Sequence, residues 1–418
     1  MATCVWYVSK YVITPVSDEA VSRGYGIMRE IAKLGHQSVI ITSDSMGMFN
    51  APVADEPIVV SHPDGMTLCR LRTLKYSTAK SLRRMLSWVD FEFRLRRLPK
   101  DLLPRPDAIV VSSLSLLTVF NGLRLRRRYG CRLVFEVRDI WPLTLTEEGG
   151  FSSRNPLVLA LGAVEKLGYR RADAIVGTMP NLREHVVAVS GSNRPTYCIP
   201  MGVDLQAIEN PEPLSDEYAA RYLPADKFVV AYAGSIGISN ALDVFFECIE
   251  RMQDEPNIHF VVLGDGDLRP AYEEKYGSLP NLTFAPRVPK NLVHDFLSRC
   301  DLLYFSVHQS AVWDYGLSLN KLIDYMLAAK PIVASFSGYP SMVNEADCGV
   351  FVPAGDALSL EAEVRRISQL SPADREAMGA RGREWLLKHR DYRQLADDYL
   401  QILVPESQPA ATSREAAE

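Results

Sequence analysis

A lysine stands at an unfavourable place in the segment GLSLNKLIDYMLAAKPIVAS, which runs from Gly316 to Ser335. Asn320 is a candidate N-cap, and apolar residues recur after it at helical spacing, so Lys321 should lie in the first turn of a helix. The helix dipole and the unpaired amide groups are positive there, which disfavours a lysine by about 0.3–1 kcal/mol unless an anion lies opposite. The pattern therefore indicates an anionic partner for Lys321.

Further residues suited to ligand binding follow three predicted strands. They are Gly234, Ser235, Gly264, Asp265, Gly266 and Arg287. Glycines let backbone amides approach a ligand closely, and an arginine fork can bind a phosphate. Each residue alone also fits a tight turn or a surface cation. Because ligands of open α/β sheets collect at the carboxyl ends of strands, their coincidence on one edge predicts a shared site.

Two series of short strands alternating with helical segments must position these groups. The first series has candidate strands at 3–8, 38–42, 108–112, 132–137, 174–177 and 196–199. The second has them at 228–234, 259–263, 282–284, 302–305, 331–334 and 349–352. Repeated strand–helix units predict mostly parallel sheets, and the restart predicts two Rossmann-like halves that join near residues 203–226.

The composition of the 418 residues allows two or three domains. No secretory signal is expected, and the longest apolar segment, 108–123, is too interrupted by Ser and Thr to be a membrane span. The seven cysteines form no CxxC pair. They are interpreted as reduced thiols used in packing, which indicates a cytoplasmic protein without a zinc site.

Basic residues concentrate in the first half, where residues 70–132 hold sixteen Lys or Arg against four Asp or Glu. The segment 74–100 mixes arginines with Leu, Trp and Phe. Such a helix suits an anionic membrane surface, near which each cation contributes about 1 kcal/mol. A solvated helix face over the core stays open as the alternative. Nucleic acid is less favoured, because no nucleic-acid module surrounds the segment and the net charge is −5.

Six segments, taken in order, resemble the retaining GT-B glycosyltransferases of the group 1 (family four) class. They are AKLGHQSVIITSD, IPMGVD, YAGSIGISNALD, VVLGDGD, RVPKNLVHDFLSRCDLLYF and NKLIDYMLAAKPIVAS. The resemblance covers about residues 1–400. Within the class, FEVRDIWPLTLTEEGG followed by NKLIDYMLAAKPIV resembles the bacterial aminosugar transferases that build O-antigen and capsule repeats.

The resemblance implies an α/β GT-B fold, in which two Rossmann-like domains face a cleft and C-terminal helices pack across both. Residues 1–203 should form the acceptor-binding domain, with a basic amphipathic insertion at 70–105. Residues 204–385 should bind the nucleotide sugar, and 386–404 should form a helix that returns to the first domain. The polar, alanine-rich tail 405–418 is predicted to be disordered.

The resemblance also assigns the donor site, residue by residue. The nucleotide-binding set is Gly234, Ser235, Gly264, Asp265, Gly266, Arg287, Val288, Asn320, Lys321, Leu322 and Asp324. Asp324 matches the acidic position that holds the ribose. Gly316 stands in place of the family's second glutamate, so Leu317, Ser318 and Leu319 are predicted to contact the donor sugar.

Two basic positions of the family are also replaced. Many members carry Arg and Lys where this chain has Ser235 and Asn240. A buried diphosphate needs positive partners, and Lys321 and Arg287 are expected to supply them.

In the first domain, Arg138 stands where family members often place a histidine. Arg138, Asp139 and Lys321 are the predicted catalytic residues, with Asp139 orienting Arg138; a structural ion pair between the first two is the alternative. Gly24 and Gly26 are predicted to form a loop that faces the phosphates. The class implies front-side transfer without a metal or other cofactor.

The expected function is retaining transfer of a sugar, taken to be an N-acetylated aminosugar, from a UDP-sugar or other nucleotide-diphosphate sugar. The acceptor would be a polyprenyl-diphosphate-linked or other cell-surface glycan. The enzyme would lie in the cytoplasm on the inner face of the plasma membrane, bound through residues 74–105. One alternative is a GT-B sugar-nucleotide epimerase, for which His294 or His308 would have to act with acids in the cleft. The other is a non-catalytic binding subunit, favoured by Gly316, Ser235 and Asn240.

Overall fold

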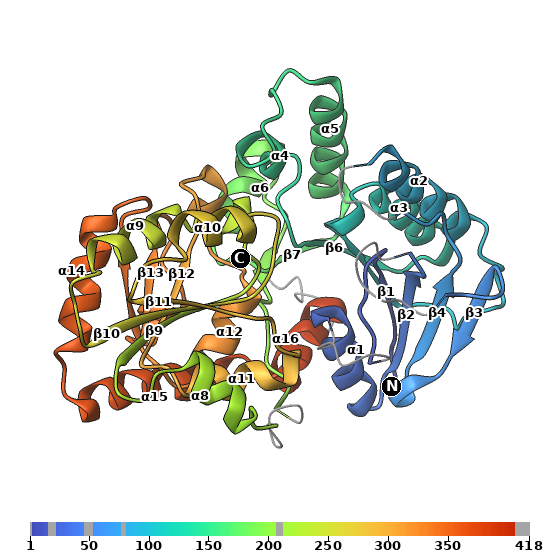
Figure 1. The fold of residues 1–418 in the computed structure, drawn as a ribbon. Helices are drawn as coiled ribbons and strands as arrows, with labels where there is room; N and C mark the ends of the chain where they lie inside the picture. The colour runs from blue at the N-terminus through green and yellow to red at the C-terminus, as the bar shows by residue number, and fades with distance from the viewer. Residues whose placement is uncertain (1, 16–21, 46–52, 77–80, 206–211, 406–418) are drawn as a thin grey trace, which may run out of the picture.

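The computed structural model describes residues 2–15, 22–45, 53–76, 81–205 and 212–405, which form two α/β domains side by side (Figure 1). In the first domain the described strands form an eight-stranded sheet of order β3-β4-β2-β1-β5-β6-β7-β8. They are β1 (Cys4–Val8), β2 (Gln37–Ser43), β3 (Ile58–Ser61), β4 (Thr67–Leu71), β5 (Ala108–Ser112), β6 (Arg132–Val137), β7 (Ala174–Gly177) and β8 (Thr196–Cys198). All pairs are parallel except β3 with β4.

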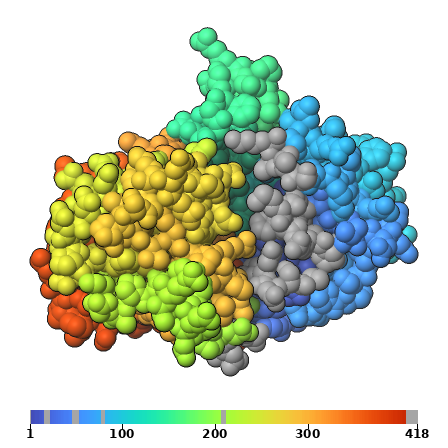
Figure 2. All heavy atoms as spheres, viewed as in Figure 1, coloured from blue at the N-terminus to red at the C-terminus, as the bar shows by residue number. Residues whose placement is uncertain are grey.

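Helices cover both faces of this sheet, which is why its central strands β1 and β5 are buried along their whole length and mostly apolar. The helical elements are α1 (Arg23–Lys33), η1 (Pro63–Gly65), α2 (Leu82–Arg96), η2 (Ser113–Ser115), α3 (Thr118–Tyr129), α4 (Leu143–Glu147), α5 (Pro156–Arg171) and α6 (Leu182–Ser190). The segment of α4 and α5 projects beyond the rest of the surface (Figure 2).

The second domain contains a parallel sheet whose described strands follow the order β11-β10-β9-β12-β13-β14. Its strands are β9 (Phe228–Ala233), β10 (Ile258–Leu263), β11 (Leu282–Ala285), β12 (Leu302–Ser306), β13 (Ile332–Ser335) and β14 (Gly349–Val352). Its helical elements are α8 (Asp216–Tyr222), η3 (Ile238–Asn240), α9 (Asp243–Arg251), α10 (Arg269–Tyr276), α11 (Lys290–Ser298), η4 (Ala311–Tyr315), α12 (Asn320–Leu327), α13 (Met342–Glu345), α14 (Ala357–Ser368) and α15 (Pro372–His389).

The last described helix, α16 (Tyr392–Leu403), returns to the first domain and packs against α1 (Figure 1). Tyr399 and Leu395 are buried there in one core with Tyr25 of α1. The helix begins after Asp391, whose side chain accepts a hydrogen bond from the Arg393 amide. The predicted segment 386–404 thus includes the end of α15 as well as α16.

Two α/β domains with a helix crossing between them confirm the predicted fold class. Sequence analysis missed β3 and β4, which extend the first sheet at its outer edge. The predicted N-cap is also wrong: Leu319 caps α12, and Asn320 is its first helical residue. Among the described residues, no helix combines the length and apolar composition that crossing a membrane requires. The predicted disordered tail lies, from residue 406 on, outside the described residues.

Candidate active site

Lys321 lies in the first turn of α12, and its ammonium group points to the carboxyl end of β9. Its Nζ donates hydrogen bonds to Asn240 Oδ1 at 2.5 Å and to the Tyr232 hydroxyl at 3.2 Å, and it lies 4.7 Å from the Tyr232 ring centroid. No carboxylate of the described chain forms an ion pair with it. Burial lowers the pKa of Lys321 to about 8. This cation is therefore partly desolvated and has only neutral partners, as a binding group for an anion would be.

The glycines at the ends of β9 and β10 permit a very close approach of two backbone segments. A Cβ atom on Gly264 would lie 1.8 Å from the Gly234 carbonyl oxygen, and one on Gly266 would lie 2.3 Å from the Ile236 carbonyl oxygen. Gly264 also has a φ of +141°, which residues with side chains rarely adopt. These glycines allow the segments that follow β9 and β10 to pack directly against each other beside Lys321. Ser235 and Asp265 are exposed on it.

Asp324, one turn after Lys321, forms an ion pair with Lys290, the first residue of α11. Sequence analysis missed Lys290, although it follows Arg287 by three residues in the same segment. Arg287 is exposed, whereas Val288 and Leu322 are buried in the domain core. Besides Lys321, this edge of the sheet thus carries an ion pair between Asp324 and Lys290. A ribose that bound to Asp324 would compete with Lys290 for its carboxylate.

Gly316 follows η4 and lies against the first domain. A Cβ atom there would be 2.4 Å from Pro180 Cδ, and the φ of Gly316 is +115°. Beside it, the Asn181 amide donates to the Tyr315 carbonyl at 3.0 Å, and the Tyr315 ring lies 5.0 Å from that of His185. The position of the family's glutamate is therefore occupied by a contact between domains.

The predicted donor-sugar residues Leu317, Ser318 and Leu319 continue from this contact. They line a cavity between the domains whose opposite side includes Thr178, Met201 and Arg390. The cavity brings the loop after Gly316 next to residues that follow β7 and β8 of the first domain.

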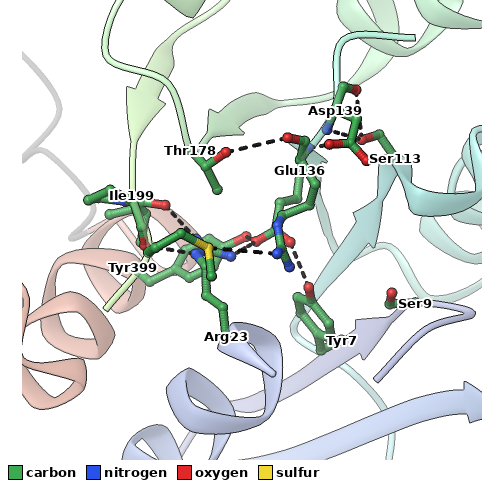
Figure 3. A network of polar contacts seen from close by, with 12 residues as sticks. Tyr7, Ser9, Arg23, Ser113, Glu136, Asp139, Thr178, Ile199 and Tyr399 are labelled. Atoms are coloured by element: carbon green, nitrogen blue, oxygen red, sulfur yellow. Dashed lines mark hydrogen bonds and ion pairs between the residues drawn. The ribbon is translucent and has the colours of Figure 1, made fainter. Parts of the chain in front are cut away.

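Arg138 and Asp139 follow β6 on the facing edge of the first domain. They form no ion pair with each other in the described structure, so that alternative is wrong and Asp139 does not hold the Arg138 guanidinium. Instead Arg138 Nη2 approaches Met201 Sδ at 3.7 Å, and the Ser113 hydroxyl donates to the Asp139 carbonyl at 3.3 Å (Figure 3). Neither residue contacts Lys321 among the described interactions.

Sequence analysis also missed Glu148, which caps α4 near Asp139. Burial raises the pKa of Glu148 and the charge of Asp139 adds to the rise, whereas His308 of the second domain lowers it. Glu148 of the first domain therefore lies within electrostatic reach of both Asp139 and His308, a histidine that follows β12. The motif TEEGG gave the only sequence signal for Glu148.

A buried polar network around Glu136 fixes α1 and α16 to the sheet (Figure 3). Arg23 Nη1 lies 2.6 Å from Glu136 Oε2, and Glu136 also accepts hydrogen bonds from the hydroxyls of Tyr7 at 2.6 Å and Tyr399 at 3.0 Å. Both Arg23 and Glu136 have side chains with 0% exposure. The Arg23 charge lowers the pKa of Glu136 against the effect of burial.

The prediction for Gly24 and Gly26 is wrong, because both residues lie inside α1. A Cβ atom on Gly24 would be 2.5 Å from Tyr7 Cε1, and one on Gly26 would be 2.8 Å from Tyr392 Cδ2. Their glycine identity lets α1 approach β1 and α16 closely. They form no loop that faces the phosphates.

Two family models match the chain, one on each domain. The model described as a glycosyl transferase 4-like domain matches residues 22–202, and the model described as glycosyl transferases group 1 matches residues 227–369. Together they cover more than three quarters of the 418 residues. The chain belongs to the group 1 glycosyltransferases.

Solved structures show that this glycosyltransferase has the GT-B fold. Sucrose-phosphate synthase from Thermosynechococcus elongatus is 18% identical with a TM-score of 0.69, and 96% of this chain and 98% of that one are covered. The E. coli trehalose-6-phosphate structure bound with UDP-2-fluoro glucose is 14% identical with a TM-score of 0.71, covering 96% and 99%. HepE from Anabaena, in complex with UDP and glucose, is 12% identical with a TM-score of 0.65, covering 96% and 100%. No curated protein matches the glycosyltransferase.

Proposed function

We propose that this glycosyltransferase moves an N-acetylated aminosugar from a UDP-sugar to a polyprenyl-diphosphate-linked glycan, with retention of the anomeric configuration. The observation that carries the donor half is the Lys321 ammonium, which has only neutral hydrogen-bond partners. A diphosphate would supply the missing negative charge. The UDP and UDP-2-fluoro glucose in two structures of the same fold support a uridine nucleotide as the donor.

The second domain offers groups for each part of the donor. Lys321 binds the diphosphate, Arg287 adds charge from the exit of β11, and Asp324 accepts the ribose hydroxyls in exchange for Lys290. As negative charge develops on the departing diphosphate, Lys321 stabilises it more strongly than it stabilises the bound donor. The departing diphosphate helps to deprotonate the acceptor hydroxyl, and Asp139, exposed at the opposite edge, orients the acceptor. The transfer is proposed to need no metal, so activity should survive treatment with EDTA.

Lys321→Met tests the donor site by titration calorimetry with UDP. Loss of hydrogen bonds to a charged group costs about 1.5–3 kcal/mol, so affinity should fall roughly 10- to 150-fold. Lys321→Arg should retain part of the affinity, and Lys388→Met, an exposed lysine of α15, should retain all of it. A Lys321→Met protein that binds UDP as tightly as the parent would remove the basis for the donor site.

The proposal of a lipid-linked acceptor rests on helix α2, which carries apolar residues on two opposite faces. Ser87, Phe91 and Leu95 are buried against the domain. On the opposite face, at positions i, i+4, i+7 and i+11, lie exposed apolar side chains: Leu82 at 78% exposure, Leu86 at 56%, Val89 at 56% and Phe93 at 49%. A helix face in water would be polar, so this stripe favours the membrane interpretation over the solvated face.

Arginines flank the exposed stripe. Arg83, Arg96 and Arg97 are exposed, and the Arg97 guanidinium lies 3.8 Å from the Phe93 ring centroid. Apolar side chains between cations suit the inner leaflet of the plasma membrane, where a polyprenyl-linked acceptor resides. The stripe and its arginines lie on α2, within the segment 74–105 for which a membrane contact is predicted.

Co-sedimentation with vesicles that contain an anionic phospholipid tests the membrane contact. Neutralising Arg83, Arg96 and Arg97 to Gln should reduce the bound fraction sharply, as should Val89→Ser with Phe93→Ser. Neutralising three exposed cations of α15, Arg381, Arg383 and Lys388, is the matched control. Unchanged sedimentation of both α2 variants would return the helix to the solvated-face interpretation.

Sugar-nucleotide epimerisation is the second candidate, favoured by the electrostatic interaction of Glu148 with His308 of the other domain. Acids and a histidine facing each other across the domains are the groups that such a reaction needs. Incubation with UDP-N-acetylated sugars and product analysis by NMR separates the candidates. An epimer formed without acceptor would replace the transferase proposal.

A further inference from the structure

A cluster of basic side chains lies outside the candidate donor site, at the carboxyl ends of three neighbouring strands of the first domain. Lys10 follows β1, Asp44 follows β2, and Arg70 and Lys75 lie at the end of β4 and beyond it. Lys10 is 0% exposed and Arg70 is 9% exposed. The Lys75 side chain is 46% exposed, so it can reach a ligand directly.

The cluster holds more positive than negative charge. Asp44 Oδ2 lies 2.6 Å from Lys75 Nζ, and the same carboxylate accepts the amide hydrogens of Ala54 and Thr73. In the described part of the chain, neither Lys10 nor Arg70 forms an ion pair. One carboxylate therefore serves three cations, two of them buried.

The neutral contacts of the two buried cations are few. Lys10 Nζ donates to the Ser45 carbonyl at 2.9 Å, and Arg70 Nη2 lies 3.4 Å from Thr14 Oγ1. The pKa of Lys10 is lowered to about 7, chiefly by burial and then by the charges of Arg84 and Lys75, while the carboxylates of Asp44 and Asp90 oppose the change. Buried cations without an anion are costly, so a bound anion would relieve an existing electrostatic strain.

Aromatic side chains connect the cluster to α2. Lys10 Nζ lies 4.6 Å from the Tyr11 ring centroid and 5.3 Å from that of Tyr76. The Trp88 indole of α2 donates to the Tyr11 hydroxyl at 2.8 Å, and Trp88 packs edge-on against Trp141 at 5.7 Å. The anionic end of a ligand at the cluster would thus lie next to an apolar wall, on the inner side of the helix that carries the exposed stripe.

Trp88 connects the cluster to the segment that carries Asp139, because its ring packs against Trp141, two residues after Asp139. The Trp88 indole also donates to the hydroxyl of Tyr11, the residue that follows Lys10. A ligand with phosphates at the cluster can therefore extend a sugar towards Asp139.

We propose that Lys10, Arg70 and Lys75 bind the diphosphate of the lipid-linked acceptor, with its isoprenoid chain leaving along Trp88 towards α2. This inference rests on the proposed function, since it assigns a position to the acceptor named there. Lys75 contacts the diphosphate at the surface. Lys10 and Arg70 act by their charge from below, and a bound dianion favours the protonated form of Lys10.

Binding of a short-chain isoprenyl diphosphate to the full chain tests this inference, with the parent isoprenyl alcohol as the second arm. UDP is kept saturating in both, so that the probe does not occupy the donor site. The wild type should bind the diphosphate at least tenfold more tightly than the alcohol. Lys75→Met and Lys10→Met should each lower affinity for the diphosphate at least tenfold and leave the alcohol unchanged. Lys33→Met, an exposed lysine of α1, should change neither.

The outcomes separate the inference from the proposed function. Equal binding of diphosphate and alcohol, or full affinity in Lys75→Met, overturns the diphosphate site even when UDP binds normally. Failure of UDP to bind speaks against the proposed donor site. The comparison of isoprenyl diphosphate with isoprenyl alcohol still tests whether the basic cluster binds a diphosphate. Inorganic pyrophosphate that binds as tightly as the isoprenyl diphosphate overturns the lipid-linked assignment. If Lys10→Met does not fold, half-exposed Lys75 still decides the outcome.

Discussion

Gly316 of the second domain lies directly against Pro180 of the first, with room for no side chain between them. A Cβ atom on Gly316 would be 2.4 Å from Pro180 Cδ. The glutamate that the family resemblance places here would therefore push the domains apart at this contact. Restoring the family residue should harm the enzyme.

Gly316→Ala is expected to destabilise the protein beyond the cost of backbone strain, because overpacking adds about 1–3 kcal/mol. Gly355 is the matched control, since its φ of +83° is also positive but no atom lies within 4 Å of a Cβ placed there. Urea unfolding should show a larger loss for Gly316→Ala than for Gly355→Ala. Adding Pro180→Ala should recover part of the difference; equal losses would contradict the packing argument.

The affinity for UDP should depend on pH through Lys321. Burial places its pKa at about 8 in the free protein, so affinity should fall as pH rises above 8 and the ammonium deprotonates. Free-protein stability should change in the opposite direction. Between pH 8 and the ordinary lysine value of 10.5 the unfolded chain binds this proton more tightly, so stability rises with pH there. Titration calorimetry with UDP checks the affinity, and scanning calorimetry of the free protein checks the stability, each at pH 7 and 9 on wild type and Lys321→Met. If the variant keeps the pH dependence, a group other than Lys321 causes it.

Removing Arg23 should strongly destabilise the first domain. Arg23→Met leaves Glu136 buried without its cation, for which about 3–5 kcal/mol is typical. Arg126→Met is the control, because Arg126 pairs with Asp173 while its side chain is 38% exposed, and such pairs contribute about 0–1 kcal/mol. Denaturant unfolding gives both values. Arg23→Met with Glu136→Gln should be less destabilised than Arg23→Met alone, and the opposite order would disprove the ion-pair explanation.

Stability should also fall with rising pH because of Glu92, which joins α2 to α3. Burial raises its pKa to about 7, while hydrogen bonds from Thr118, Asn121 and Ser115 limit the rise. Between about pH 4.5 and 7 the folded chain holds a proton that the unfolded chain has released, so stability is lost as pH rises through this window. Glu92→Gln should flatten the profile between pH 5 and 8, and exposed Glu376→Gln should leave it unchanged.

The hydrophobic pattern was sufficient to predict the fold, because strands buried on both faces form short apolar runs between helices. The predicted ranges 108–112, 132–137, 174–177 and 349–352 coincide with β5, β6, β7 and β14. The outer strands β3 and β4 were missed. In β4, Arg70 interrupts an otherwise apolar run, and the segment was interpreted through its charge instead.

The site was less predictable, because its contacts join residues far apart in sequence. Gly26 packs against Tyr392 of α16, a partner that no local pattern reveals, so its glycine was interpreted as a loop residue. Similarly, the ion pair of Lys290 with Asp324 depends on how α11 and α12 pack. Lys321 could be identified because its position in the helix is a local property.

The return of α16 to the first domain has a consequence for synthesis of the chain. The Tyr399 hydroxyl bonds to Glu136, across 263 positions of sequence. Synthesis must therefore proceed as far as α16 before the N-terminal domain can complete its core, although the strands of that domain are made much earlier. Until then α1 exposes the surface that α16 later covers, and the second domain has time to fold in between.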